Sequence, residues 1–311
     1  MDSSSAFLLS TNQIVYFTVY AILASVIVTF NLSVLIPIIA KKSLRNENRF
    51  LYMLSTCSSD LCTGFSCFYI GSKGDALDMH SSPADTRYIV PTFLGLSYLV
   101  TLAAQADRYH AVSSPYKYLR RMTVMRTVFL ILGLWVYAFL IVAINNLVTS
   151  NVAIKVTSAG TFFCYFFTMV IMIGLNIKLF MIAKYQIERD PATSEKEAKR
   201  ASLYLIIVVS GFFLVTWFPT ILHISLCDFI AVPCQPMEKK GTAVLKFLPR
   251  MNAAITPMLY VYGCKPLRQK LRKVWKTVCQ CNRSFSISQQ RTQRTAVQPL
   301  ADVVIINTVD K

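Results

Sequence analysis

An acid and a base stand side by side at the end of an apolar run in the segment AAQADRYHAVSSPYKY. No residue between Pro91 and Leu102 is charged, and Asp107 and Arg108 follow shortly after. A guanidinium at a membrane edge can be neutralised by a neighbouring carboxylate while its aliphatic stem stays in the apolar layer. On its own, this arrangement is also explained by a snorkelling anchor, which is found at many helix ends.

Oxygen-bearing side chains lie inside other apolar runs. Asp60 stands in LSTCSSDLCTGF, Asn31 and Ser97 are central in two further runs, and Asn252 and Thr256 are four positions apart. A carboxylate among hydroxyl and amide oxygens suits a hard cation such as sodium. The alternative is that these groups hydrogen-bond one another across helices. Residues Asp60, Ser97, Asn252 and Thr256 are the candidate sodium ligands.

Catalytic patterns are missing from the sequence. The chain has 3 His and 9 Cys, without the spacing of a metal cluster, and it has no glycine-rich phosphate loop. We therefore expect that the protein is not an enzyme and needs no cofactor beyond a sodium ion.

The elements that must position these residues are membrane-spanning helices. With 54% hydrophobic and 15% charged residues and a mean hydropathy of +0.49, the composition does not suit a soluble protein. A hydrocarbon layer about 30 Å thick needs roughly 20 apolar residues per helix. Seven stretches qualify, at 14–40, 50–71, 88–107, 127–149, 157–183, 201–227 and 242–263.

An all-α, seven-transmembrane helix bundle with a C-terminal amphipathic helix on the membrane surface is therefore the expected fold. The predicted divisions are an extracellular N-terminus at 1–13, the bundle at 14–263, the amphipathic helix at 264–281 and a disordered cytoplasmic tail at 282–311.

Positive charge is concentrated in the connections. Most of the 32 Lys and Arg lie in 41–49, 110–126, 184–200 and 265–283, which follow the first, third, fifth and seventh spans. The positive-inside rule places these segments in the cytoplasm and the N-terminus outside. The net charge of +17 thus sets topology and favours contact with anionic membrane lipid, and it does not indicate nucleic-acid binding.

Three cations occupy the opposite, outer half. Lys246 and Arg250 share one helix face, and Arg87 stands at the entrance of the third span. Such cations suit a carboxylate, phosphate or sulfate ligand. The alternative is that Lys246 snorkels outward and Arg87 pairs with Asp85.

Taken together, these marks resemble the rhodopsin-like (class A) G-protein-coupled receptors across essentially the whole chain. The matching residues are Asn31, Asp60, Asp107-Arg108-Tyr109, Pro115, Tyr118, Trp135, Phe213, Trp217, Pro219, Thr256, Pro257 and Tyr260.

The resemblance implies a plasma-membrane receptor that exchanges signals with a heterotrimeric G protein, and that meets receptor kinases and arrestin. It implies that Arg108 is released on activation to contact the G protein. Proline kinks a helix, so Pro219 and Pro257 mark flexible points, and the resemblance assigns Trp217 a ligand-responsive role. The sixth helix is expected to swing outward near Pro219.

Several departures point to one part of this family. No Cys occurs between Cys67 and Cys164, so the family's usual extracellular disulfide cannot form. The second extracellular loop is short, and the fifth span lacks proline. These features resemble the melanocortin, lysophospholipid and cannabinoid receptor cluster, in which a local disulfide such as Cys227 to Cys234 occurs.

Other departures concern activation. Thr256 stands where most members have Asn or Asp, and Asn176 replaces a tyrosine. Lys199 falls where an acid would pair with Arg108, and Glu195 and Glu197 are only approximate substitutes for that acid. We expect a poorly latched inactive state with appreciable basal signalling.

The resemblance also narrows the ligand. Val90 stands where amine receptors carry an aspartate, and Arg250 stands at the position of the opsin lysine, which argues against an amine and a chromophore. The cations Arg87, Lys246 and Arg250, beside aromatic residues such as Trp217, favour an amphiphilic acid or lipid, and a small peptide stays open.

Beyond the last span, residues 265–281 show apolar residues at helical spacing among Lys and Arg, as in a helix on an anionic membrane surface. Cys279 and Cys281 are candidate palmitoylation sites; unmodified thiols are the alternative.

Two other functions remain possible from the sequence. A transporter or channel would use Asp60 with Lys246 and Arg250, but it leaves the Asp107-to-Tyr118 pattern unexplained. An odorant-type chemosensory receptor has the same fold.

Overall fold

The computed structural model describes residues 11–72, 89–147, 151–189, 194–229 and 243–273, and every long element in these ranges is an α-helix. The helices are α1 (Thr11–Ala40), α2 (Lys42–Arg45), α3 (Asn48–Ser72), α4 (Ile89–Ser113), α5 (Pro115–Arg121), α6 (Val124–Leu147), α7 (Asn151–Arg189), α8 (Ser194–Phe229) and α9 (Ala243–Gly263). Residues 265–273 are helical as well. Two compact units divide the chain, Met1–Cys264 and Lys265–Lys311.

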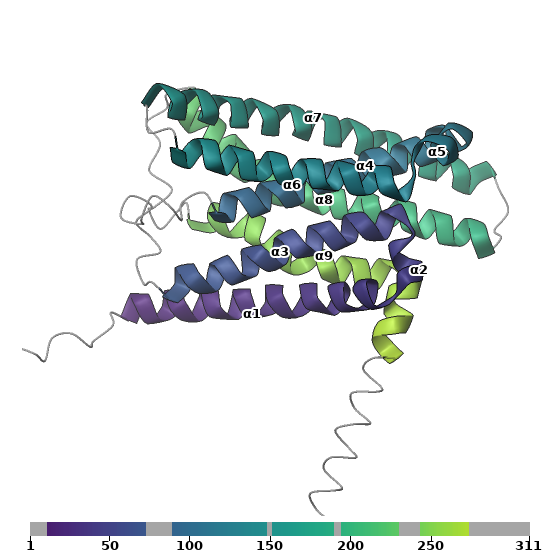
Figure 1. The fold of residues 1–311 in the computed structure, drawn as a ribbon, viewed down its shortest axis with the longest axis horizontal. Helices are drawn as coiled ribbons and strands as arrows, with labels where there is room; N and C mark the ends of the chain where they lie inside the picture. Colours follow the sequence, from purple (N-terminus) through teal and green to yellow (C-terminus); the bar gives the residue numbers. More distant parts are fainter. Residues whose placement is uncertain (1–10, 73–88, 148–150, 190–193, 230–242, 274–311) are drawn as a thin grey trace, which may run out of the picture. The chain divides into compact units, whose positions relative to one another are not determined.

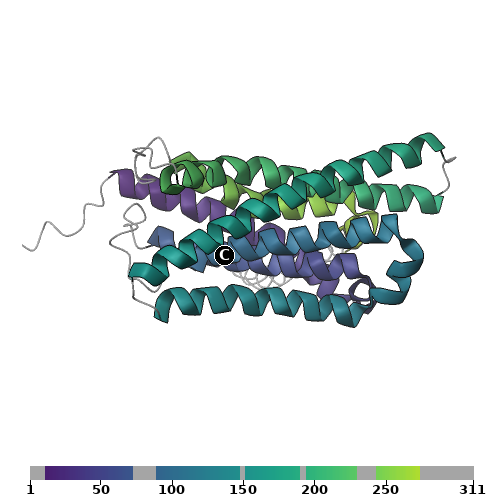
Figure 2. The ribbon, with the colours of Figure 1, turned by 90° about the horizontal axis from the view of Figure 1, so that it is seen from above.

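The seven predicted spans correspond to α1, α3, α4, α6, α7, α8 and α9, which lie lengthwise beside one another in the first unit (Figures 1 and 2). Most of these helices are longer than the apolar runs, and α7 extends six residues beyond the prediction at each end. A helix can continue into water after the apolar layer ends, so hydropathy underestimates its length.

Hydropathy alone identifies fewer spans than the fold contains. Among the described residues, four helices are long and apolar enough to cross a membrane, within Phe17–Ala40, Val124–Ile144, Phe162–Tyr185 and Leu203–His223. The remaining long helices, α3, α4 and α9, carry polar residues that are fully buried among their neighbours, including Asp60, Gln105 and Thr256. These polar groups lower the mean hydropathy of helices that occupy the inside of the bundle.

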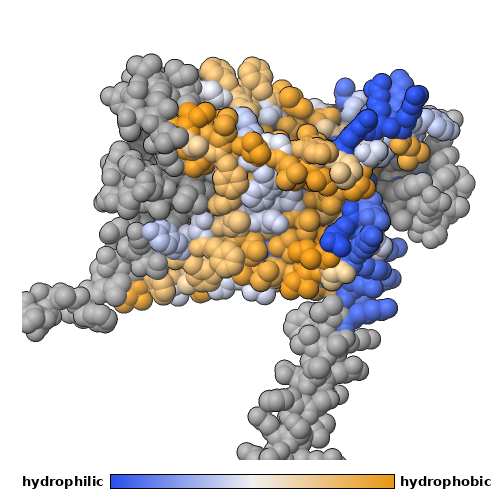
Figure 3. Space-filling model, viewed as in Figure 1, coloured by the Kyte–Doolittle hydropathy of each residue, from blue (hydrophilic) through white to orange (hydrophobic). Residues whose placement is uncertain are grey.

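The surface of the bundle matches a membrane environment. Apolar side chains cover the visible middle of the helices, and hydrophilic ones gather at the end that holds α2 and α5 (Figure 3). Basic residues at this end include Lys42 and Arg45 on α2 and Arg120 and Arg121 on α5. The charged end is the one that the positive-inside rule assigns to the cytoplasm.

Hydrogen bonds donated by side chains join the inner helices. The indole of Trp135 on α6 donates to the Ser55 hydroxyl on α3 at 2.9 Å, and the Ser59 hydroxyl donates to the Phe93 carbonyl of α4 at 2.7 Å. Polar pairs of this kind are a common way of joining helices in lipid.

Candidate functional site

A compact polar cluster occupies the cytoplasmic end of α4. Asp107, only 4% exposed, accepts a hydrogen bond from the Tyr118 hydroxyl, which lies 3.1 Å from each carboxylate oxygen. The same hydroxyl oxygen accepts a hydrogen bond from the Asn48 side chain of α3 at 3.1 Å. One phenol therefore joins α3, α4 and α5.

Local sequence brings Tyr118 back to α4. The chain leaves the helix at Ser114, and Pro115 begins α5, where its fixed φ suits the first helical position. One turn later, Tyr118 packs edge-on against the ring of His110, with 5.7 Å between the ring centroids. Burial and then the charge of Asp107 raise the pKa of Tyr118, so the hydroxyl keeps its proton as a donor at neutral pH.

Arg108 turns away from this cluster. Its guanidinium is 3.7 Å from the Asp107 carboxylate, and its side chain is 21% exposed. Within the part of the chain that the structure describes, Asp107 is the acid that pairs with it. The side chains of Glu195, Glu197 and Lys199 lie outside that part.

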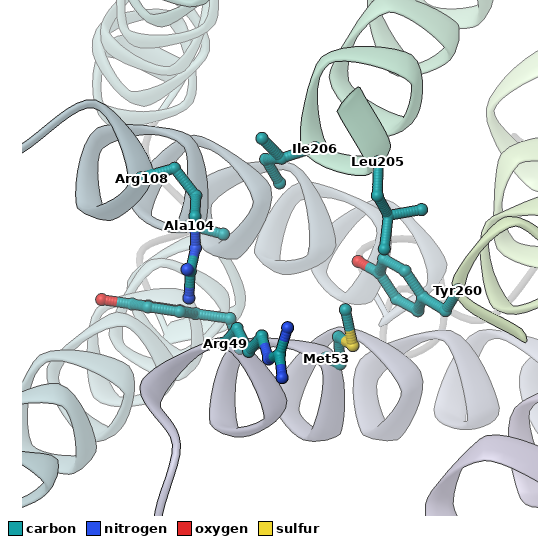
Figure 4. Close-up of a pocket in the computed structure, with 8 residues that line it drawn as sticks. Arg49, Met53, Ala104, Arg108, Leu205, Ile206 and Tyr260 are labelled. Carbon is teal, nitrogen blue, oxygen red and sulfur yellow. The ribbon is translucent and has the colours of Figure 1, made fainter. Parts of the chain in front are cut away.

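A small cavity opens beside Arg108, between α3, α4, α8 and α9. Its lining consists of Arg49, Tyr52, Met53, Ala104, Arg108, Leu205, Ile206 and Tyr260. Figure 4 shows the guanidinium groups of Arg49 and Arg108 and the Tyr260 hydroxyl turned toward this space. The volume of the cavity that water can occupy is about 20 Å³, which is enough for one or two water molecules. A polypeptide helix about 10 Å wide cannot enter unless α8 moves.

The predicted sodium ligands come together only in part. Asp60, Ser97, Asn252 and Thr256 are all at most 2% exposed, and Ser97 neighbours the Asp60 carboxylate. One oxygen of that carboxylate, Oδ2, is buried without a hydrogen-bond partner among the described groups. The Thr256 hydroxyl instead donates to the Asn252 amide oxygen at 2.7 Å, and the Asn252 amide donates to Thr216 at 2.9 Å.

Asn31 forms hydrogen bonds that connect two helices. Its amide donates to the Ala253 carbonyl of α9 at 2.9 Å and to the Ile27 carbonyl of its own helix at 2.8 Å. The side chain therefore joins α1 to α9 at the level of the polar set.

An aromatic cluster surrounds Trp217 in the middle of α8. The rings of Phe213 and Trp217 are stacked at 5.9 Å, and Tyr98 of α4 and Tyr165 of α7 lie 5.5 and 5.9 Å from Trp217. A side chain at Gly95 would collide with the Tyr165 hydroxyl, so this ring requires glycine opposite it. Pro219 lies inside α8 immediately beyond the cluster, and Pro257 lies inside α9.

Of the predicted ligand cations, Arg250 is the one whose side chain is described. Its guanidinium lies over the Tyr20 ring of α1, 5.6 Å from the centroid, and also interacts with the Cys67 thiol of α3. Phe247, one turn earlier, contacts the same Tyr20 ring at 5.4 Å. The arginine is thus held inside the outer half of the bundle.

Other predicted residues cannot be placed. The side chains of Arg87, Val90, Lys246 and Cys227, and the residues Cys234, Cys279 and Cys281, lie outside the described part of the chain.

Sequence reasoning missed Asn48 and Arg49, the first two residues of α3. Both fall in the segment 41–49, whose basic residues were assigned to topology alone. The signal that could have identified them is their position: they are polar residues at the start of an otherwise apolar helix, at the same cytoplasmic membrane edge as Asp107.

Comparison with known proteins gives one family. The family model described as "7 transmembrane receptor (rhodopsin family)" matches residues 30–260. The adenosine receptor A2b of Gallus gallus is 23% identical over 86% of this chain and 89% of that receptor. The melanocortin receptor 3 of Rattus norvegicus is 27% identical over 58% of this chain and 57% of its own length.

These matches confirm the class A resemblance and the seven-helix fold, and they do not favour a transporter. The melanocortin match agrees with one member of the expected cluster, whereas similarity to adenosine receptors was not expected. The family match covers most of the chain and includes the Asp107–Arg108 pair, the Trp217 cluster and Pro257. The chain belongs to the rhodopsin family of seven-transmembrane receptors and is a multi-pass membrane protein.

Proposed function

We propose that this G-protein-coupled receptor lies in the plasma membrane with its N-terminus outside, and that it signals by movement of α8 away from Arg108. The observation that carries the proposal is the cavity beside Arg108, which the α8 residues Leu205 and Ile206 close on one side. Arg108 has a single described ion pair, at 3.7 Å, so little holds its guanidinium against an incoming partner.

The position of Pro219 supports a hinge. A proline inside a helix removes one backbone hydrogen bond and leaves a point at which the helix bends. Pro219 lies two residues beyond Trp217, and Ile221 on its outer side packs in the same hydrophobic cluster. Rearrangement of that cluster by a ligand would therefore rotate the cytoplasmic half, which includes Leu205 and Ile206, and widen the cavity for the G protein.

The ligand is an amphiphilic anion. Arg250 stands seven residues inside α9, in a setting of aromatic rings and the Cys67 thiol. A charged group that far inside a membrane protein usually serves function, and guanidinium binds carboxylate and phosphate in a bidentate manner. Arg87 and Lys246 would add charge at the entrance, and apolar surface would hold the remainder of the ligand.

A sodium ion stabilises the closed receptor at Asp60. The buried, unpartnered Oδ2 of Asp60 and the neighbouring Ser97 hydroxyl fit a small hard cation. Asn252 and Thr256 bond to one another, so they would contribute only after a small rearrangement.

The remaining parts regulate the receptor. Cys227 and Cys234 form a local disulfide, and palmitoyl groups at Cys279 and Cys281 anchor the helix that begins at residue 265. Phosphorylation of serine and threonine residues in the tail at 282–311 by receptor kinases then recruits arrestin.

Ligand-independent coupling tests this function. Wild type and Arg108→Ala would be purified, reconstituted in nanodiscs and mixed with a panel of Gα subtypes, and nucleotide exchange measured. We expect wild type to accelerate exchange on at least one subtype and Arg108→Ala to lose the acceleration. Equal exchange by the two proteins on every subtype would contradict the proposed role of Arg108.

A further inference from the structure

A buried polar junction joins three helices one turn outward from Arg108. Gln105 of α4 is fully buried, and its amide nitrogen donates to the Met172 carbonyl of α7 at 3.1 Å. The same nitrogen lies 3.3 Å from the Ser210 hydroxyl of α8. Met172 and Ser210 are fully buried too, so water does not compete for these hydrogen bonds.

Ser210 contacts two other helices at once. Its hydroxyl lies 3.1 Å from the Asn176 amide oxygen of α7 and 2.6 Å from the Ile206 carbonyl of its own helix. A hydroxyl carries one proton and two lone pairs. It can therefore accept the hydrogen of Gln105 while its own proton goes to Asn176 or to Ile206. With the proton on Asn176, one side chain ties α8 to both α4 and α7, and with the proton on Ile206 it ties α8 to α4.

This junction is neutral. Within the described residues, the ion pair of Arg108 is with Asp107 on the same helix, so it does not hold α8. Lys199 on α8 has the same charge sign as Arg108. The neutral junction is therefore one contact by which the cytoplasmic half of α8 is held against α4 and α7.

The position of the junction makes it sensitive to a swing of α8. Ser210 lies nine residues from Pro219 on the cytoplasmic side, a distance of about 13 Å along a helix. Rotation about a hinge at Pro219 displaces Ser210 by several ångströms for a rotation of about 15° or more, which exceeds the length tolerance of a hydrogen bond. The junction can form only while α8 is packed against α4 and α7.

We propose that Gln105, Ser210 and Asn176 form a latch that holds the receptor in its closed state, and that its opening releases α8. The latch rests on the proposed movement of α8. The three side chains are positioning residues, since they act on α8 through hydrogen bonds between helices.

Removal of one hydroxyl tests the latch. Ser210→Ala should raise basal nucleotide exchange about threefold over wild type at equal receptor concentration, because a mean interhelical hydrogen bond in a membrane protein shifts an equilibrium by about that factor. Ser58→Ala is the control, since the partly buried Ser58 hydroxyl bonds to the Leu54 carbonyl of its own helix and joins no second helix through that bond. It should leave basal exchange unchanged.

A double-mutant cycle separates the latch from general loosening. Gln105→Leu should raise basal exchange as Ser210→Ala does, and the double variant should show less than the product of the two effects. If the increase in basal exchange of the double variant equals the product of the two single increases, the residues act independently and the latch is overturned. Equal basal exchange by Ser210→Ala and Ser58→Ala would overturn it as well.

A second readout keeps the latch testable if wild type activates no Gα subtype. Amide hydrogen exchange over residues 200–210 should then be faster in Ser210→Ala than in wild type and Ser58→Ala. Faster exchange without coupling would leave the latch standing and count against the proposed function. Identical exchange in the three proteins would overturn the latch.

Discussion

The Tyr118 hydroxyl lies 3.1 Å from both carboxylate oxygens of Asp107, although the two residues belong to different helices. Asp107 is consequently held by a neutral donor as well as by the neighbouring Arg108. The phenol keeps the carboxylate in place, and Arg108 is left to face the cavity.

Loss of this phenol should destabilise the receptor. Tyr118→Phe leaves the buried Asp107 without its neutral donor, and a hydrogen bond to a charged group contributes about 1.5–3 kcal/mol. We expect a lower Tm of the purified protein in nanodiscs. Tyr116→Phe is the control, because Tyr116 is 89% exposed on the same helix. Equal Tm values for the two variants would mean that the Tyr118 hydrogen bond contributes nothing to stability.

Sodium should stabilise the wild-type receptor through Asp60. At a concentration ten times the Kd, a ligand that binds only the folded state adds roughly 1.4 kcal/mol. Replacement of potassium by sodium at constant ionic strength should raise the Tm of wild type and leave Asp60→Asn unchanged. A sodium response that persists in Asp60→Asn would place the ion elsewhere, and no response in wild type would remove the ion from the mechanism.

The contact between Gly95 and Tyr165 predicts a specific rescue. Gly95→Ala places a methyl group where the Tyr165 hydroxyl lies, and overpacking of this kind typically costs about 1–3 kcal/mol. Tyr165→Phe removes the hydroxyl and should restore much of the lost Tm in the double variant. Gly133→Ala, at a position with open space around it, should be neutral or stabilising. Additive losses in the double variant would contradict the contact.

An anionic agonist should depend on Arg250. A screen of amphiphilic carboxylates and phosphates on cells that express the receptor should yield agonists whose potency falls at least about tenfold in Arg250→Gln, the effect of losing one charge-assisted hydrogen bond. Arg126→Gln, at the cytoplasmic start of α6, should leave potency unchanged. Agonists that keep full potency on Arg250→Gln would exclude this residue from the ligand site.

The sequence was most informative where composition and spacing determine the outcome. Apolar runs in which a few polar residues were accepted located all seven long helices, although a strict hydropathy criterion finds only four among the described residues. The Asp107–Arg108 pair lies near the cytoplasmic end of the third, which continues to Ser113. The set Asp60, Ser97, Asn252 and Thr256 was predicted from oxygen-bearing residues inside apolar runs; all four are buried, and as a sodium site the set stays a prediction. Asn31 bonds to the Ala253 carbonyl.

Contacts between helices were beyond prediction. Tyr118 reaches Asp107 only because α5 folds back after Ser114, and the meeting of Gln105 with Ser210 depends on the rotation of α4 and α8 about their own axes. Periodicity gives the face of a helix but not the neighbour that it meets. The cavity beside Arg108 could not be predicted for the same reason, because its lining depends on where the packing of α8 places Leu205 and Ile206.

The low hydropathy of α3, α4 and α9 bears on how the chain is made. During synthesis each segment must leave the translocon for lipid, and one central Asp in a helix opposes that transfer by about 2.5–3.5 kcal/mol. Asp60 on α3 has this effect until neighbouring helices cover it. The apolar α1 enters lipid first and pairs with α3 through an extensive contact that includes Gly64, where a methyl group would press on Ile27 and Val28. Biogenesis of the receptor therefore depends on the pairing of α1 with α3, and substitutions at Gly64 will reduce the amount of receptor that is made.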